Sequence, residues 1–164
     1  MALPLPNWAR MTESTFAAIR RVAAGLLVAA ACAASACDEP LKDVAGPSPN
    51  LQPTFSSINT EVFETTDLAG RTSCVTCHTN QGRNPASGLN LRTDPFTALV
   101  NAPSRGRQGA ILVVPGDPES SYLIRKLEGR DISGVRMPQN GPPYLTSGQI
   151  LVIRRWIELG APNN

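Results

Sequence analysis

The sequence is short of histidine, methionine, aromatic residues and charge. It has one histidine, His78, and three methionines, Met1, Met11 and Met137. Aromatic residues make up 5% and charged residues 17% of the 164 residues, whereas proline and glycine number 15 and 13. This composition excludes a coiled coil and a collagen, and it indicates one loop-rich domain with a modest core and additional segments.

The formal net charge of +2 would suggest a weakly basic protein, but the excess of basic over acidic residues lies at the N-terminus. If residues 1–36 are removed, the loss of Arg10, Arg20 and Arg21 lowers the number of basic residues from 15 to 12. The loss of Glu13 lowers the number of acidic residues from 13 to 12. The remaining chain is neutral, which argues against electrostatic binding of a nucleic acid.

Residues 1–36 have the pattern of a secretory signal peptide. Arg20 and Arg21 stand before the uncharged residues 22–36, which are mostly Ala, Leu and Val. A basic segment, an apolar segment and small residues at the end are the features of such a signal. The apolar stretch is shorter than the roughly 20 residues of a comfortable transmembrane helix, although an uncleaved anchor helix remains the alternative. Met11 is an alternative start to Met1.

Two cysteines near the end of this segment are candidates for lipidation. Residues 34–36, Ala-Ser-Ala, precede Cys37, and residues 29–31, all alanine, precede Cys32. Small residues directly before a cysteine resemble the lipobox of bacterial lipoproteins. We favour Cys37, because it leaves a fuller apolar segment and no stray thiol in the mature chain. Alternatively, ordinary signal peptidase could cleave after Ala-Ser-Ala and leave Cys37 as a free N-terminal thiol.

Residues 37–54 contain four prolines and no apolar periodicity, which predicts an extended tether. After a lipidated cysteine, such a tether would hold the next domain near a membrane and let it move; an unstructured leader would look the same. Residues 55–164 are long enough for one hydrophobic core.

Hydrophobic spacing and capping signals predict an all-α fold for this domain. We expect helices over residues 56–67, 94–100, 117–127 and 147–159, and the third of them should be closed by Gly129. The last helix opens with a capping box of Thr146 and Gln149. Its expected solvated side chains are Gln149, Arg154, Arg155 and Glu158.

Residues 110–114 are a β-branched run that could form one strand, with residues 89–91 as the only candidate partner. The long proline- and glycine-rich loops of this small domain indicate that they wrap something.

Cys74-Val75-Thr76-Cys77-His78 is the most specific motif in the chain. Cys-x-x-Cys-His is the attachment signature of a c-type haem. Two thiols one helical turn apart can form thioethers with the two vinyl groups of a porphyrin, and the histidine then faces the iron from the proximal side. Covalent attachment suits a domain that is too small to enclose the haem fully.

Three other interpretations of the motif were weighed. A zinc site needs four ligands, commonly cysteine and histidine, and the mature chain has no sensible fourth. A thioredoxin-like redox pair needs a βαβ setting, whereas the surrounding sequence is helical. A disulfide between Cys74 and Cys77 would close a very small loop and stabilise little.

The second axial ligand of the iron can be sought by elimination. No histidine besides His78 exists, so the candidates are Met137, Lys42, Lys126 or nothing. Lys42 lies in the expected tether, and Lys126 is expected to face water. Met137 lies in a proline-rich loop stiff enough to hold a thioether on the iron, and Pro138 restricts it to an extended backbone. The alternative is that this methionine fills the core.

These residues resemble class I-type cytochrome c over about 55–164. The shared order is an N-terminal helix, the Cys74–His78 motif, a loop, Met137 and a C-terminal helix. More closely, the chain resembles single-haem cytochrome c-like domains of exported bacterial proteins. The similar phrases are VPGDPESS from Val114, RMP from Arg136 and WIELGA from Trp156.

The resemblance implies one covalent haem c, with thioethers at Cys74 and Cys77 and iron ligated by His78 and Met137. It also implies that the first helix packs on the last, here through Phe63 and Trp156, and that a carbonyl near Pro85 orients the proximal histidine. A departure from the family pattern is the long insertion that carries Arg105 and Arg107.

The function expected from these features is electron transfer, because an iron with both axial positions filled has no place for a substrate. We expect a periplasmic, membrane-anchored lipoprotein with redox proteins as partners and without catalysis of its own. The alternatives are a haem subunit or electron-exit module of a larger oxidoreductase complex, and a haem-based sensor whose Met137 is displaced by small gases.

Overall fold

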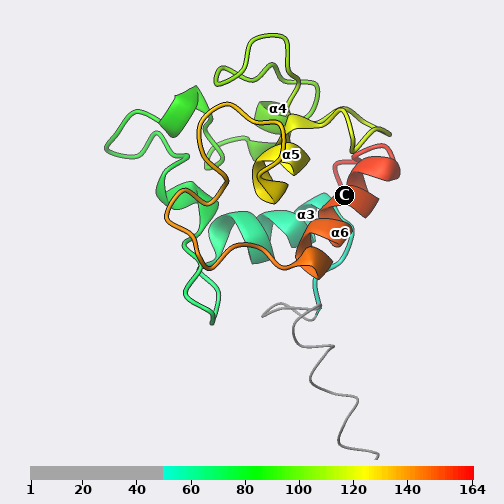
Figure 1. Ribbon diagram of the computed structural model, residues 1–164. Helices are drawn as coiled ribbons and strands as arrows, with labels where there is room; N and C mark the ends of the chain where they lie inside the picture. Colours follow the sequence, from blue (N-terminus) through cyan, green and yellow to red (C-terminus); the bar gives the residue numbers. More distant parts are fainter. Residues whose placement is uncertain (1–49) are drawn as a thin grey trace, which may run out of the picture. The chain divides into compact units, whose positions relative to one another are not determined.

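A computed structural model describes residues 50–164 (Figure 1). The expected signal peptide, most of the expected tether, Cys32 and Cys37 lie outside the described residues. Within residues 50–164 helices are joined by loops, and β-pairing is limited to isolated bridges. The predicted all-α class is confirmed. No helix among these residues has the length and apolarity needed to cross a membrane.

The first helix comprises an α-helical turn, Phe55–Ile58 (α3), and a π-helical continuation, Asn59–Glu64 (η2). Thr54 caps its start by accepting a hydrogen bond from the Ser57 N–H. The helix ends short of the predicted residue 67, because Thr65 adopts an extended backbone.

Two short helices follow in the middle of the chain. The helix α4, Pro95–Leu99, begins as predicted, with the Asp94 carboxylate accepting from the Thr97 N–H. The helix α5, Tyr122–Glu128, begins later than predicted, and Ser121 is its N-cap residue. It ends as predicted at Gly129, which has a φ of 77° in the left-handed region that glycine tolerates best.

The late start of α5 has a physical cause in the Asp117-Pro118 segment. The Asp117 carboxylate accepts from the Ser120 N–H, and the Ser121 hydroxyl donates to the Asp117 carbonyl. These bonds close a separate turn, as aspartate and serine often do. The prediction of a helix from residue 117 was therefore wrong.

The last helix, Ser147–Glu158 (α6), has the predicted capping box of Thr146 and Gln149. Gln149 was expected to be solvated but is 1% exposed, because its side-chain oxygen accepts from the Thr146 N–H. In contrast, Leu151 and Leu159 are exposed.

Residues 110–114 do not pair with residues 89–91, the only candidate partner that the sequence offered for a strand there. Val113 instead bridges to Val100, and Ile111 to Pro103. On its other side the segment meets α5, since the Tyr122 N–H donates to the Ile111 carbonyl. The neighbouring loop and the first turn of α5 therefore take the hydrogen-bonding groups that a longer strand would need.

The core joins the first helix to the last, which lie side by side in Figure 1. The Trp156 ring is fully buried, with its centroid 5.6 Å from that of Phe55. Phe55 also makes an edge contact with Phe96 on α4. We expected this helix contact to involve Phe63, which lies in the same core.

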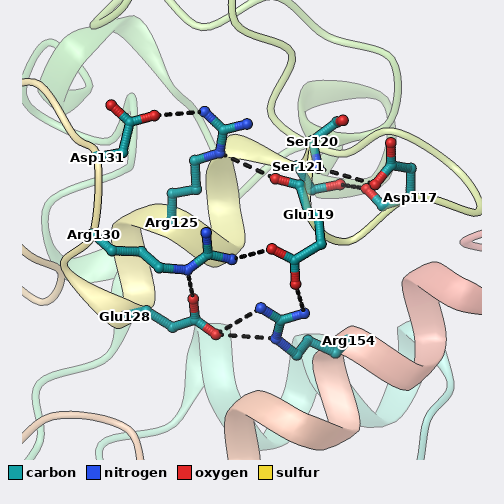
Figure 2. A network of polar contacts seen from close by, with 9 residues as sticks. All are labelled: Asp117, Glu119, Ser120, Ser121, Arg125, Glu128, Arg130, Asp131 and Arg154. Atoms are coloured by element: carbon teal, nitrogen blue, oxygen red, sulfur yellow. Dashed lines mark hydrogen bonds and ion pairs between the residues drawn. The ribbon is translucent and has the colours of Figure 1, made fainter.

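A ring of ion pairs connects α5 to α6 (Figure 2). Arg154 on α6 contacts Glu119 at 2.6 Å and Glu128 at 2.9 Å, and Arg130 contacts the same two carboxylates. The hydrogen bonds from Arg154 and Arg130 lower the pKa of Glu119. Because the ring is largely at the surface, it contributes little to the overall stability. We infer that it mainly holds α5 and α6 in position relative to each other.

Replacing Trp156 with alanine should lower the free energy of unfolding by about 3–5 kcal/mol, because it removes a large, fully buried side chain. It also removes the hydrogen bond from the indole N–H to the Pro162 carbonyl. Urea unfolding of the purified protein measures the loss. Leu151→Ala in the same helix is the matched control, since Leu151 is 62% exposed, and it should change stability by less than about 0.5 kcal/mol. Equal losses in the two variants would contradict this description of the core.

Candidate functional site

The Cys74–His78 motif begins in a short 3₁₀ helix, Cys74–Thr76 (η3). The carbonyl of Cys74 accepts from the N–H groups of Cys77, at 3.2 Å, and His78, at 2.9 Å. This single turn places both cysteines and the histidine along the wall of one cavity.

A buried arginine supports the motif from behind. The Arg71 side chain is fully buried and donates to the Asp67 carboxylate at 2.9 Å. It also donates to the carbonyls of Val62 and Thr65, at the end of η2. The Cys74 sulfur lies 3.7 Å from the same Val62 carbonyl. Arg71 thus ties the end of the first helix to the segment that leads into the motif.

Arg71 did not stand out in the sequence, although its separation of four residues from Asp67 was a possible signal. A buried arginine is retained only when it is paired and its donors are used, as they are here.

The two cysteine thiols are free and lie in different environments. Burial raises the pKa of the Cys74 thiol to about 11, against the opposing influence of the nearby Arg71 guanidinium. Cys77 is exposed. The two thiols do not form a disulfide with each other.

The imidazole of His78 is oriented by a backbone carbonyl. Its Nδ1 lies 3.1 Å from the Ala86 oxygen. A carbonyl can only accept, so Nδ1 carries the proton in this hydrogen bond and Nε2 keeps a free lone pair. Burial lowers the pKa of His78, which favours the neutral imidazole that a metal requires. The carbonyl belongs to Ala86, the residue that follows Pro85.

Met137 lies in the long loop between α5 and α6, which passes around α5 in Figure 1. Its side chain is half-buried and packs against the core. Its backbone N–H donates to the Lys126 carbonyl at 2.9 Å. The peptide bonds before Pro138, Pro142 and Pro143 are cis.

We expected Lys126 to face water, but its side chain makes contacts within the protein. Its ammonium donates to the Ser133 carbonyl at 3.1 Å and to the Val135 carbonyl, and its side chain lines the cavity. The Lys126 ammonium therefore makes its hydrogen bonds within the protein.

The insertion that departs from the family pattern contributes to the cavity wall. Arg105 lines the cavity and lies so close to Gly88 that a Cβ there would stand 2.6 Å from its guanidinium nitrogen. Arg107 pairs with Asp131 at 3.1 Å and lies over the ring of Tyr122.

The cavity has a volume of about 1210 Å³, larger than the roughly 300–1,000 Å³ of a typical small-molecule site. The four predicted haem-binding residues, Cys74, Cys77, His78 and Met137, all line it. Much of the rest of its wall is apolar, with Phe63, Leu89, Leu91, Leu112, Leu123 and Leu127.

The chemistry of this wall fits a flat, largely apolar macrocycle with anionic edges. Among the described residues that line the cavity there are two cations, Arg105 and Lys126, and no carboxylate. For the zinc interpretation, residues 50–164 contain no group of three or more His, Cys, Asp and Glu side chains placed to hold a metal ion.

Comparison with known proteins gives one match. A family model described as Planctomycete cytochrome C matches residues 74–141, which run from the first cysteine of the motif past Met137. No curated protein and no solved structure matches the chain. The match and the helical fold support a cytochrome c-like domain around residues 74–141, which implies haem c with its iron and suggests haem-based electron transfer in general.

Proposed function

We propose that this protein is an electron carrier of the cell envelope, built as a class I-type cytochrome c. In this proposal one haem is attached through Cys74 and Cys77, and its iron is ligated by His78 and Met137. The protein exchanges electrons with redox partner proteins and is anchored to the membrane through a lipid on Cys37.

One observation carries the proposal. The same cavity is lined by the thiols of Cys74 and Cys77, the neutral imidazole of His78 and the thioether of Met137. Met137 is distant in sequence from the other three residues. The Lys126 ammonium, which was the competing nitrogen donor within the described residues, is committed to two backbone carbonyls. This supports Met137 as the soft donor for the second axial position.

In this proposal His78, the cavity wall and the Met137 loop have separate roles. A haem iron with both axial positions filled supplies reversible one-electron exchange and offers no position to a substrate, and methionine ligation raises its potential. His78 keeps Nε2 available because Ala86 holds the proton-bearing Nδ1. The apolar cavity wall excludes water from the ring faces, and the loop before α6 brings the Met137 thioether to the cavity.

The first prediction concerns covalent attachment. After maturation in a host with haem-attachment machinery, the intact protein should be heavier than its polypeptide by the mass of one haem. Cys74→Ala and Cys77→Ala should each weaken or abolish the attachment, because each removes one thioether. Denaturing mass spectrometry measures both. A mature protein that carries zinc, or no cofactor, would refute the proposal.

A second prediction concerns the membrane anchor. Cells fed a radioactive fatty acid should label the wild-type protein and the Cys32→Ser variant, but not Cys37→Ser. If label persists in Cys37→Ser and is lost in Cys32→Ser, the lipid is on the other cysteine. If neither variant changes the result, the protein has no lipid anchor at these positions.

A third prediction separates a carrier from a sensor. Met137→Ala should retain the haem, since the two thioethers and His78 still hold it, but it should lower the potential and let carbon monoxide bind the reduced protein quickly. The ferric wild type should show the weak far-red absorption band of sulfur-ligated haem, and the variant should lack it. An unchanged band and potential would mean that Met137 only packs in the core. Rapid binding of carbon monoxide to the wild type would favour the sensor.

A subunit of a larger oxidoreductase would be recognised by the proteins with which it is isolated. Gentle extraction of the native protein from membranes, followed by identification of its stable partners, distinguishes a free carrier from a complex subunit.

A further inference from the structure

Four hydrogen bonds made by Tyr122 and Lys126 fasten residues 133–137 to α5. The Tyr122 hydroxyl accepts from the Ser133 N–H at 2.9 Å. The Lys126 ammonium donates to the Ser133 and Val135 carbonyls. The Lys126 carbonyl accepts from the Met137 N–H at 2.9 Å.

Tyr122 and Lys126 can act together because they are four residues apart on one helix and so share a face. Both line the cavity. Between them they satisfy the N–H and the carbonyl of Ser133, so this residue is held from both sides. Tyr122 is itself buried and held in place by the core and by Arg107 over its ring.

The loop has little apolar packing of its own to hold it. Val135 is 50% exposed, and Ser133 and Gly134 are also exposed. Since loops of this kind open easily, the position of the next residues depends on polar contacts. The Arg136 side chain adds one more, from its Nε to the Leu127 carbonyl at 2.7 Å.

We infer that Tyr122 and Lys126 are positioning residues that set the axial ligation of the haem without touching the iron. Their hydrogen bonds fix residues 133–137 on α5, and this fixes the height at which the Met137 thioether enters the cavity. The inference rests on the proposed function, because it concerns the thioether that we assign to the iron.

The test compares variants of the haem-loaded protein. Lys126→Leu removes both bonds to the loop without adding a second thioether to the cavity, and Tyr122→Phe removes only the hydroxyl. The population with Met137 off the iron should rise about tenfold or more in Lys126→Leu, because two hydrogen bonds from a charged group are lost, and less in Tyr122→Phe. The far-red band of the ferric protein should weaken in that order, and the rate of carbon monoxide binding should rise toward that of Met137→Ala.

Arg154→Met is the matched control. It also removes a half-buried cation with two partners, but these are Glu119 and Glu128, not residues 133–137. It should keep the wild-type band and the wild-type rate of carbon monoxide binding. Amide hydrogen exchange gives a readout that does not depend on the iron: the N–H groups of Ser133 and Met137 should exchange faster in Lys126→Leu and not in Arg154→Met.

The outcomes separate the inference from the proposal beneath it. If the wild type shows the band, Met137→Ala lacks it, and Lys126→Leu and Tyr122→Phe both keep it in full, the inference is overturned and the assignment of Met137 stands. If Arg154→Met loses the band as much as Lys126→Leu, the effect is general destabilisation and the inference is also overturned. If the wild type has no such band, the axial assignment and the inference fall together.

Discussion

A cavity of about 1210 Å³ lies within a small domain, and this constrains everything around it. Part of its wall belongs to the hydrophobic core, through residues such as Phe63, Leu91 and Leu127, and the more exposed parts are held by directed bonds. The structure supplies these bonds from behind. Arg71 binds the end of η2 and the segment before Cys74, and α5 binds the loop that carries Met137.

The two sides of the cavity are stabilised by different physics. On the side of the motif, a fully buried arginine is neutralised by Asp67 and uses its remaining donors on backbone carbonyls, which rigidifies the chain. On the side of Met137, the loop is exposed and is fastened by hydrogen bonds to one face of α5. The first arrangement is costly to open, whereas the second lies nearer to the mobile end of the range found in folded proteins.

The first helix, the last helix and α5 provide the rigid frame for these attachments. Phe55 and Trp156 join the two outer helices through buried rings, and the ring of ion pairs through Glu119 and Arg154 connects α6 with α5. A change in the core would therefore reach the cavity through the helices. The functional residues themselves contribute little to this frame, which is consistent with sites carried by loops on a rigid scaffold.

The helical class, the capping box of α6, the end of α5 at Gly129 and the cytochrome c-like motif could be predicted from the sequence, because these depend on local spacing and on caps formed by neighbouring residues. The turn at Asp117 is also local, but its side-chain bonds compete with a helix that the same residues could have begun. The burial of Gln149 and Arg71, the contacts of Lys126 and the partners of residues 110–114 are visible only in the folded chain. For Arg71, Lys126 and residues 110–114, the polar groups had several possible partners along the chain, and the choice among them depended on which segments folding brought together.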